Sequence, residues 1–324
     1  MTNGTACPYC QSPEIVKFGL FEGIQRYWCK ACKRKFTLTG ALPKMKTPKR
    51  VIASALSCYY SGMSLDGVQR HLQQQFGIYL SEAGIYNWII RFSREAVKHS
   101  KDFRPAVGST WIADETMIDV AGRKVWFWDI IDTRSRYLLA SHLSTTRSTK
   151  DAALLMHKAA TRAGKPPRKV ITDRLAVYLD GIELVFGADT KHVQSKPFTV
   201  VDSTNMIERF HGTLKDRTKV VRGFKNMETA RLLTEAWLVH YNFFKEHESL
   251  GHTPPAQKMR LPLPFDDWAG VLDNVERDML AGTPRPEPPP QHRPVVHTYA
   301  KTQPKRKRKP ATRGSISPTL GQIR

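Results

Sequence analysis

The 324-residue chain has no apolar run near the roughly 20 residues that a membrane-spanning helix needs. Its first ten residues also lack the charged segment followed by an apolar segment that marks an export signal. The sequence contains no internal repeats of the kind that build solenoids or propellers. We therefore expect a cytoplasmic protein with no membrane partner, and the chain length favours two or three folded units over one core.

Acidic residues are scarce relative to basic ones. The chain has 29 Asp and Glu against 51 Lys and Arg, which gives a formal net charge of +22. Residues 283–324 contribute +9 of this, so the rest of the chain is still basic at +13. A field of this sign attracts a polyanion without selecting its sequence. The charge therefore predicts nucleic-acid binding, and by itself it suits a ribosomal or nonspecifically adhering protein equally well.

Cysteine is also rare, and four of the five cysteines form two Cys-x-x-Cys pairs separated by 18 residues. Soft thiolates with this spacing are typical of a structural, tetrahedral Zn²⁺ site. A redox pair is the alternative that the pattern leaves open. We expect a zinc ribbon over residues 1–42, and its ligands would be Cys7, Cys10, Cys29 and Cys32.

Residues 47–100 show the apolar periodicity of three short helices, and Ser64 and Ser81 stand at helix N-cap positions. Three helices of this kind suit a helix-turn-helix domain, whose last helix would enter the major groove of DNA. A helical bundle that only links two domains is the alternative. The residues of the last helix that we expect to contact DNA are Tyr86, Asn87 and Arg91.

Residues 109–262 change to an α/β pattern. Runs rich in β-branched and aromatic residues predict three successive strands at 111–113, 124–131 and 137–143. A helix over 148–163 and a short buried strand over 169–172 follow. This order predicts an α/β domain with a mixed sheet.

The C-terminal part consists of a short helical extension over residues 263–281 and a tail over residues 282–324. The tail is rich in proline, which excludes a continuous helix or a central strand. It also contains five consecutive basic residues, 305–309, which repel one another. We therefore expect a disordered basic tail that is solvated or contacts DNA nonspecifically.

Three carboxylates are the candidate catalytic residues. Asp114 and Asp173 each follow an apolar strand, and Glu208 belongs to a helix that begins near Asn205. Ligands of open α/β sheets bind beside the carboxyl ends of strands. Three converging carboxylates would hold two Mg²⁺ or Mn²⁺ ions, which suits an in-line displacement at phosphorus by water or a 3′-hydroxyl.

Spacing alone leaves other interpretations open. Acidic residues at strand ends are often turn or cap residues, and the segment from Asn205 to Glu208 has the pattern of a capping box. Glu115 and Asp119 are further candidates in the same domain, and so are Asp129, Asp132 and Asp202. Of these, Asp129 and Asp132 bracket the second strand and are the strongest alternatives as metal ligands.

The helix that carries Glu208 also carries candidate DNA contacts. Glu208, His211 and Lys215 share one face at helical spacing. We therefore expect His211 and Lys215 to reach a phosphate group, with Lys215 acting as a point charge. Asn205, at the start of this helix, is a further candidate DNA contact.

Several segments resemble the DDE transposases of prokaryotic insertion sequences, which are relatives of the retroviral integrases. The sequence WIADET resembles the first-Asp strand of that family, ITD the second-Asp strand, and NMIER its N-x-I-E segment. Between Asp173 and Glu208 lie 34 residues, close to the family's usual gap. The sequences HYN and LGHTPPA resemble its closing segment, and these matches lie at 111–116, 171–173, 205–209, 240–242 and 250–256.

The resemblance covers about residues 110–260 and implies a ribonuclease-H-like core. It implies that Asp114, Asp173 and Glu208 form a metal-binding catalytic triad, and that Asp129 and Asp132 are structural. One departure is that Arg174-Leu175-Ala176 follows Asp173 in place of small or Lys/Gly-type residues, which leaves the local phosphate contacts open.

The same resemblance implies a function and partners. The ribbon and the helix-turn-helix domain would bind the terminal inverted repeats of a mobile element, and the core would cleave these ends and join them to target DNA. A homodimer or higher oligomer on DNA, in a prokaryotic nucleoid, is also implied. A catalytically silent regulator is the alternative, against which the intact Asp-Asp-Glu set argues. A nuclease without strand transfer is a third possibility, disfavoured by the helix-turn-helix pattern and the LGHTPP segment.

Overall fold

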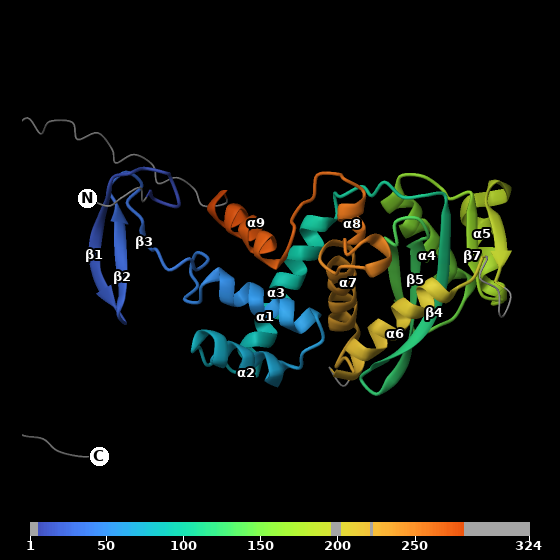
Figure 1. The fold of residues 1–324 in the computed structure, drawn as a ribbon, viewed down its shortest axis with the longest axis horizontal. Coiled ribbons are helices and arrows are strands. Elements are labelled where there is room, and N and C mark those ends of the chain that lie inside the picture. The colour runs from blue at the N-terminus through green and yellow to red at the C-terminus, as the bar shows by residue number, and fades with distance from the viewer. Residues whose placement is uncertain (1–5, 196–201, 221–222, 282–324) are drawn as a thin grey trace, which may run out of the picture. The chain divides into compact units, whose positions relative to one another are not determined.

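The computed structural model describes residues 6–195, 202–220 and 223–281 (Figure 1). The predicted basic tail, residues 282–324, lies outside the described residues. Within the described ranges, no helix combines the length and the apolar character that crossing a membrane would require.

The N-terminal part is a small antiparallel sheet of three strands in the order β1-β2-β3. Cys29 is the last residue of β2, so the strand itself places one member of the second cysteine pair. The strands are β1 (Ile15–Phe21), β2 (Ile24–Cys29) and β3 (Lys35–Thr37).

Three helices follow, and two of them begin at the predicted caps. The side chain of Ser64 accepts a hydrogen bond from the backbone N–H of Gly67, and that of Ser81 from Gly84. Each cap satisfies one of the free amide donors of the first helical turn. The helices are α1 (Lys49–Tyr60), α2 (Leu65–Phe76) and α3 (Glu82–Ser100).

Helix α9 (Trp268–Ala281) packs against α1 and α3, although it lies almost 170 residues after α3 in the sequence. Lys49 of α1 contacts Asp273 at 2.5 Å and Glu276 at 2.6 Å, and the ring of Tyr60 stacks on Trp268 with centroids 4.8 Å apart. Ion pairs that are partly exposed to solvent contribute little to stability, so the buried aromatic contact is the stronger attachment. The predicted extension is therefore a packed part of the helical segment.

The α/β part contains a five-stranded sheet in the order β6-β5-β4-β7-β8, as the mixed pattern predicted. Strands β4, β5 and β6 are antiparallel neighbours, whereas β7 pairs with β4 and β8 in parallel. The strands are β4 (Thr110–Val120), β5 (Arg123–Asp132), β6 (Leu138–Ser144), β7 (Lys169–Thr172) and β8 (Lys191–Gln194).

Strand β4 is much longer than the sequence predicted. Ala121 and Gly122 both have positive φ, 54° and 74°, which is the backbone of a tight type I′ hairpin turn. This turn allows β4 and β5 to pair along their whole length, from Trp111 with Asp132 to Val120 with Arg123. The hairpin carries the first candidate aspartate in its interior.

Helices cover both faces of this sheet. Glu115 of β4 contacts Tyr178 of α5, whereas its neighbour Asp114 lies beside His211 of α6. Because successive side chains of a strand point to opposite faces, α5 and α6 lie on opposite sides of the sheet. The helices are α4 (Thr149–Ala163), α5 (Ala176–Phe186), α6 (Asn205–Val220), α7 (Met227–Phe243) and α8 (Pro255–Lys258).

Candidate functional site

Three aspartates form a row across the middle of the sheet. Asp114 on β4 pairs directly with Asp129 on β5. On the other side, Ile112 pairs with Ile171 of the parallel strand β7, so Asp173, which follows this strand, comes next to Asp114. The row runs outward from the core, because the exposed fraction of the side chain rises from 0% for Asp129 to 14% for Asp114 and 41% for Asp173.

His211 occupies the buried end of this row. Its Nε2 lies 2.6 Å from Oδ1 of Asp129, and its Nδ1 lies 3.5 Å from Oδ2 of Asp114. Asp132 is also fully buried and accepts hydrogen bonds from the backbone N–H and the hydroxyl of Ser135. Both alternatives to the proposed triad therefore already have protein partners in the core.

The position of His211 corrects one expectation. We expected it to face phosphate together with Glu208 and Lys215, but it is buried, whereas Glu208 and Lys215 are exposed. At roughly 100° per residue, Lys215 is offset from Glu208 by about 20° around the helix, but His211 by about 60°. This rotation brings His211 against the sheet.

The structure brings Asp114 and Asp173 together but leaves Glu208 apart. Among the described residues, carboxylate oxygens of Asp114, Glu115 and Asp173 lie within 4.8 Å of one another, and Glu208 is not in this group. The side chain of Glu208 accepts a hydrogen bond of 2.7 Å from the hydroxyl of Thr204. Glu208 stands three residues, about 4.5 Å along the helix axis, before His211.

Glu115 enters the cluster from the other face of the sheet and has two partners, the exposed Arg147 and the buried Tyr178. Arg147 donates from Nε at 2.9 Å, and the Tyr178 hydroxyl donates at 2.5 Å. A second nitrogen of Arg147 lies 4.0 Å from Asp173. Arg147 is therefore the local counter-charge of the cluster, and nothing in its sequence context, just before α4, indicated this role.

The electrostatics of the cluster suit a divalent cation. Burial raises the pKa of Asp114 to about 7, with repulsion from Asp129 and Glu115 acting in the same direction and His211 opposing it. Burial alone would lower the pKa of His211, but Asp129 and Asp114 raise it. A group of crowded carboxylate oxygens is the donor set that hard cations such as Mg²⁺ prefer.

The raised pKa of Asp114 leads to a pH-dependent prediction. Below about pH 7 the carboxyl keeps its proton, which a divalent cation must displace. We therefore expect Mg²⁺ or Mn²⁺ to raise the Tm more at about pH 8 than at about pH 6. Thermal unfolding of the wild type and Asp114→Asn at both values measures this, and the pH difference should vanish in the variant. An equal rise at both values in the wild type would contradict the prediction.

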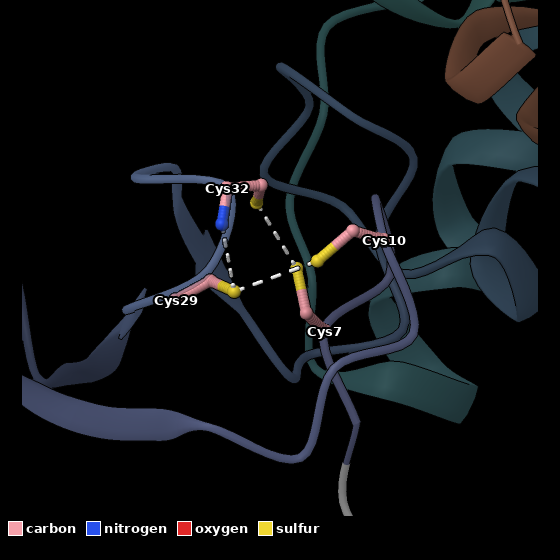
Figure 2. A group of neighbouring side chains, drawn as sticks. All are labelled: Cys7, Cys10, Cys29 and Cys32. Carbon is pink, nitrogen blue, oxygen red and sulfur yellow. Dashed lines mark hydrogen bonds between the residues drawn. The ribbon is translucent and has the colours of Figure 1, made fainter. Parts of the chain in front are cut away.

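The four paired cysteines converge in the N-terminal part (Figure 2). The sulfur atoms of Cys7 and Cys32, and those of Cys10 and Cys29, are each 3.6 Å apart. A tetrahedral ion with bonds of about 2.3 Å to sulfur requires sulfur separations of roughly 3.8 Å. The arrangement therefore fits one tetrahedral ion such as Zn²⁺.

The thiols of this cluster differ in acidity without a metal ion. Burial raises the pKa of Cys7 to about 12. Burial would also raise the pKa of Cys29, but hydrogen bonds from the backbone of Cys32 and from Cys10 lower it to about 7. A bound cation would stabilise all four thiolates, because metal ligation requires the deprotonated form.

The other candidate DNA contacts lie on α3 and α6. Asn87, Asn205 and Lys215 are exposed, and Tyr86 is half-buried. Arg91 is exposed as a residue, but its guanidinium lies 3.5 Å from the sulfur of Met45 and 3.8 Å from that of Met279 on α9, so it borders the contact with α9.

Residues 108–247 match a protein-family model described as a DDE domain, of the IS240 transposase type. No curated protein matches the chain in sequence. Similar solved structures include the HTLV-2 integrase catalytic core domain in complex with magnesium, with 17% identity over 48% of this chain and 99% of that chain and a TM-score of 0.38. The BIV integrase catalytic core domain is 19% identical over 47% of this chain and 94% of that chain, with a TM-score of 0.36.

Proposed function

We propose that this chain is a transposase that cleaves and joins DNA, because residues 108–247 match a family model described as a DDE domain. It binds the terminal inverted repeats of a mobile element and transfers the cleaved ends to target DNA. The observation that carries this proposal is the pairing of β4 with β7, which sets Asp114 beside Asp173 under the helix that bears Glu208.

We assign Asp114, Asp173 and Glu208 as the ligands of the catalytic cations. Mg²⁺ or Mn²⁺ held there would supply the charge stabilisation that in-line displacement at phosphorus requires. Glu208 is exposed, so turning away from Thr204 is the movement that would bring it to the two aspartates. Lys215 is seven residues further along α6, and in this proposal it contacts a phosphate of the bound strand.

His211 positions Asp114 rather than contacting DNA in this proposal. Its bond to the fully buried Asp129 fixes the imidazole, and the other ring nitrogen faces Asp114. Partners of this kind orient metal ligands, and their loss typically costs about 10–100-fold in metal affinity. Glu115 has the corresponding role on the opposite face, where Arg147 and Tyr178 hold it.

The N-terminal parts supply DNA recognition in this proposal. The cysteine cluster holds a structural Zn²⁺, and the exposed start of α3 reads the inverted repeat. We propose the domain limits 1–42, 47–100, 109–262 and 263–281, with 282–324 as a basic tail. A transposase must hold two ends together, so we also propose a homodimer or higher oligomer on DNA.

Strand cleavage and joining on labelled DNA tests this function. The wild type should cut at the element end and join it to target DNA with Mg²⁺ or Mn²⁺, and should do neither without divalent cations. A protein that binds the end but neither cuts nor joins with any divalent metal would refute the enzyme and favour the catalytically silent regulator.

Variants of His211 test its positioning role. His211→Gln retains a donor for Asp129, so the Tm should change little, while the Mg²⁺ concentration for half-maximal cleavage should rise about 10-fold. His211→Leu leaves Asp129 buried without a partner and should cost about 3–5 kcal/mol of stability. Cleavage titrations against Mg²⁺ and denaturant unfolding measure the two effects. Unchanged metal dependence in His211→Gln would exclude the role.

A further inference from the structure

The two faces of the N-terminal sheet, which consists of β1, β2 and β3, have different surroundings. One face carries Tyr27 and Phe36, which are directly opposite each other and whose rings stack with centroids 5.8 Å apart. Phe36 belongs to the small buried cluster formed with the cysteines, and Tyr27 packs against it. This face of the sheet is therefore occupied by the interior of the small domain.

The second face of this sheet, which we call the open face, is rich in aromatic rings. Val16 on β1 is directly opposite Trp28 on β2, and directly opposite residues share a face. The ring of Phe18 stacks on that of Trp28, with centroids 5.8 Å apart, so Phe18 belongs to the same face. The open face consists of Val16, Phe18, Phe21, Arg26, Trp28 and Lys35.

A bulge in β1 brings two of the rings together. Phe18 and Phe21 are three residues apart, so a regular strand would place them on opposite faces. The pairing of β1 with β2 instead shifts register between Lys17 and Leu20, and Gly19 has a φ of 74°. The extra residue of the bulge turns both rings to the open face. It also interrupts the free edge of β1, which hinders pairing of that edge with a strand of another chain.

The apolar side chains of the open face are accessible to solvent. The exposed fractions are 38% for Phe18, 52% for Phe21 and 38% for Val16. None of the three belongs to either of the buried clusters that the described residues form. Contiguous apolar surface of this kind marks an interaction site.

Two cations lie among these rings. Nζ of Lys35 is 4.1 Å from the centre of the Phe18 ring. The guanidinium carbon of Arg26 is 5.6 Å from the centre of the same ring and 5.3 Å from that of Phe21. The open face therefore combines flat apolar surface with positive charge.

Within the part of the chain that the structure describes, neither of these cations forms an ion pair. Glu22, at the turn after β1, lies 2.9 Å from Lys46 instead. The charges of Arg26 and Lys35 are therefore available to an anion. Rings that alternate with such cations suit a nucleic-acid strand, because bases stack on the rings while phosphates meet the cations.

The rings further favour a strand whose bases are unpaired. A duplex keeps the faces of its bases inside the helix and presents only base edges and phosphates. Unpaired bases can be splayed out and stacked on aromatic side chains. The flat rings of the open face are therefore complementary to single strands.

We propose that the open face binds single-stranded DNA, with bases stacked on Phe18 and Phe21 and phosphates on Arg26 and Lys35. A base that stacks on Phe18 displaces Lys35 from the ring, and its ammonium then meets the neighbouring phosphate. The choice of DNA over RNA rests on the proposed function, in which the same chain cleaves DNA. This ligand differs from the duplex sequence that α3 reads in that function.

Binding of labelled oligothymidine, which does not pair with itself, tests the proposal with the full-length protein. Mg²⁺ and Mn²⁺ are left out, so cleavage does not contribute. We expect Phe18→Ala to bind about 10-fold more weakly than the wild type, a factor that corresponds to about 1.4 kcal/mol. The metal content of the variant should equal that of the wild type, because Phe18 lies outside the cysteine cluster.

Leu20→Ala is the matched control for Phe18→Ala. Leu20 is on the same strand and is 67% exposed, but it is opposite Gln25 and so lies on the other face of the sheet. The control should bind oligothymidine as the wild type does. Unchanged affinity in Phe18→Ala, or equal losses in the two variants, would overturn the proposal.

Two further variants separate stacking from plain apolar contact. Phe18→Trp keeps a flat ring and should retain the affinity of the wild type, whereas Phe18→Leu keeps only apolar surface and should lose it as Phe18→Ala does. Wild-type affinity in Phe18→Leu would exclude stacking. Lys35→Gln should lower the slope of log affinity against log salt by about 0.7, as expected for one phosphate contact on a single strand. An unchanged slope would exclude that contact.

Other occupants of the open face give different results with Phe18→Ala. Equal losses for oligothymidine and for its duplex with oligodeoxyadenosine would assign the face to duplex DNA. Tighter binding of oligouridine by the wild type would assign it to RNA. A change of oligomeric state in sedimentation, with unchanged DNA affinity, would assign it to a second copy of the chain. Each of these results would overturn the proposal.

The proposal and the proposed function fail separately. A wild type that never cleaves DNA, but whose binding of oligothymidine depends on Phe18, would refute the transposase and leave the open face as a site for single-stranded DNA. Normal cleavage together with binding that does not depend on Phe18 would have the opposite meaning.

Discussion

Asp114→Asn should abolish metal-dependent strand cleavage, with a loss of about 10³-fold or more. Asp114 is the middle carboxylate of the row and lies within 4.8 Å of both Glu115 and Asp173. Replacing its charge with an amide removes the ligand that the strand pairing places at the centre of the cluster. Cleavage of labelled element-end DNA with Mg²⁺ and with Mn²⁺ measures the effect.

Asp119→Asn is the matched control for this prediction. Asp119 lies on the same strand but at the hairpin turn, where it accepts a hydrogen bond from Gly122 and lies 3.7 Å from Lys124. We expect the cleavage activity of the Asp119→Asn variant to stay within about twofold of the wild type. Near-normal cleavage by a folded Asp114→Asn protein would show that Asp114 is not a ligand of the catalytic cations.

The variants Glu208→Gln and Glu115→Gln together identify which residue is the third carboxylate ligand of the catalytic cations, beside Asp114 and Asp173. We expect Glu208→Gln to lose cleavage as Asp114→Asn does, with little change in Tm, because Glu208 is exposed. Glu115→Gln should mainly reduce stability, because Arg147 and Tyr178 then lose a buried charged partner. If instead Glu115→Gln abolishes cleavage with an intact fold and Glu208→Gln cuts normally, the site is the compact group of Asp114, Glu115 and Asp173.

Cys29→Ser should release the bound zinc and weaken binding to element-end DNA by about 100-fold or more, because zinc binding supplies the folding energy of such small domains. The three-stranded sheet has only a small buried cluster, in which Cys7, Cys29 and Cys32 are joined by Phe36. Metal analysis of the purified protein and end-binding titrations measure the two effects. The unfolding transition of the α/β part should remain.

Cys58→Ser is the control for the zinc prediction. Cys58 is half-buried on α1 and stands outside the four-cysteine group. The variant should keep one zinc ion per chain and bind element-end DNA as the wild type does. Full zinc content in Cys29→Ser, or equal losses in the two variants, would contradict the assignment of the cluster.

Features that depend on near neighbours were determined by the sequence. Two Cys-x-x-Cys pairs predicted the group that the structure assembles, because each pair places its thiols in one tight turn. Ser64 and Ser81 predicted where α2 and α3 begin, because a cap bonds to an amide only three residues away. The mixed sheet followed from the order of the strands and helices, and the match of residues 108–247 to a DDE domain agrees with it.

The composition of the carboxylate cluster depended on tertiary structure. Spacing alone left Asp129 as an alternative to Asp114, and the family resemblance implied that Asp129 is structural. The pairing of β4 with β5 and the bond from His211 of α6 give the physical reason, because they hold Asp129 in the core. Helical spacing placed His211 near Glu208, but the side of α6 that meets the sheet decided that His211 is buried. Arg147 gave no sequence signal at all.

In the helical segment, too, some features were evident from the sequence and others depended on the tertiary structure. Its apolar periodicity and caps were evident from the sequence, whereas the packing of α9 against α1 and α3 was not. Capping and turn chemistry act within a few residues, so a single sequence contains them. Strand register, the buried side of a helix and the partners of a charge depend on residues tens to hundreds of positions apart, and only the folded chain brings those together.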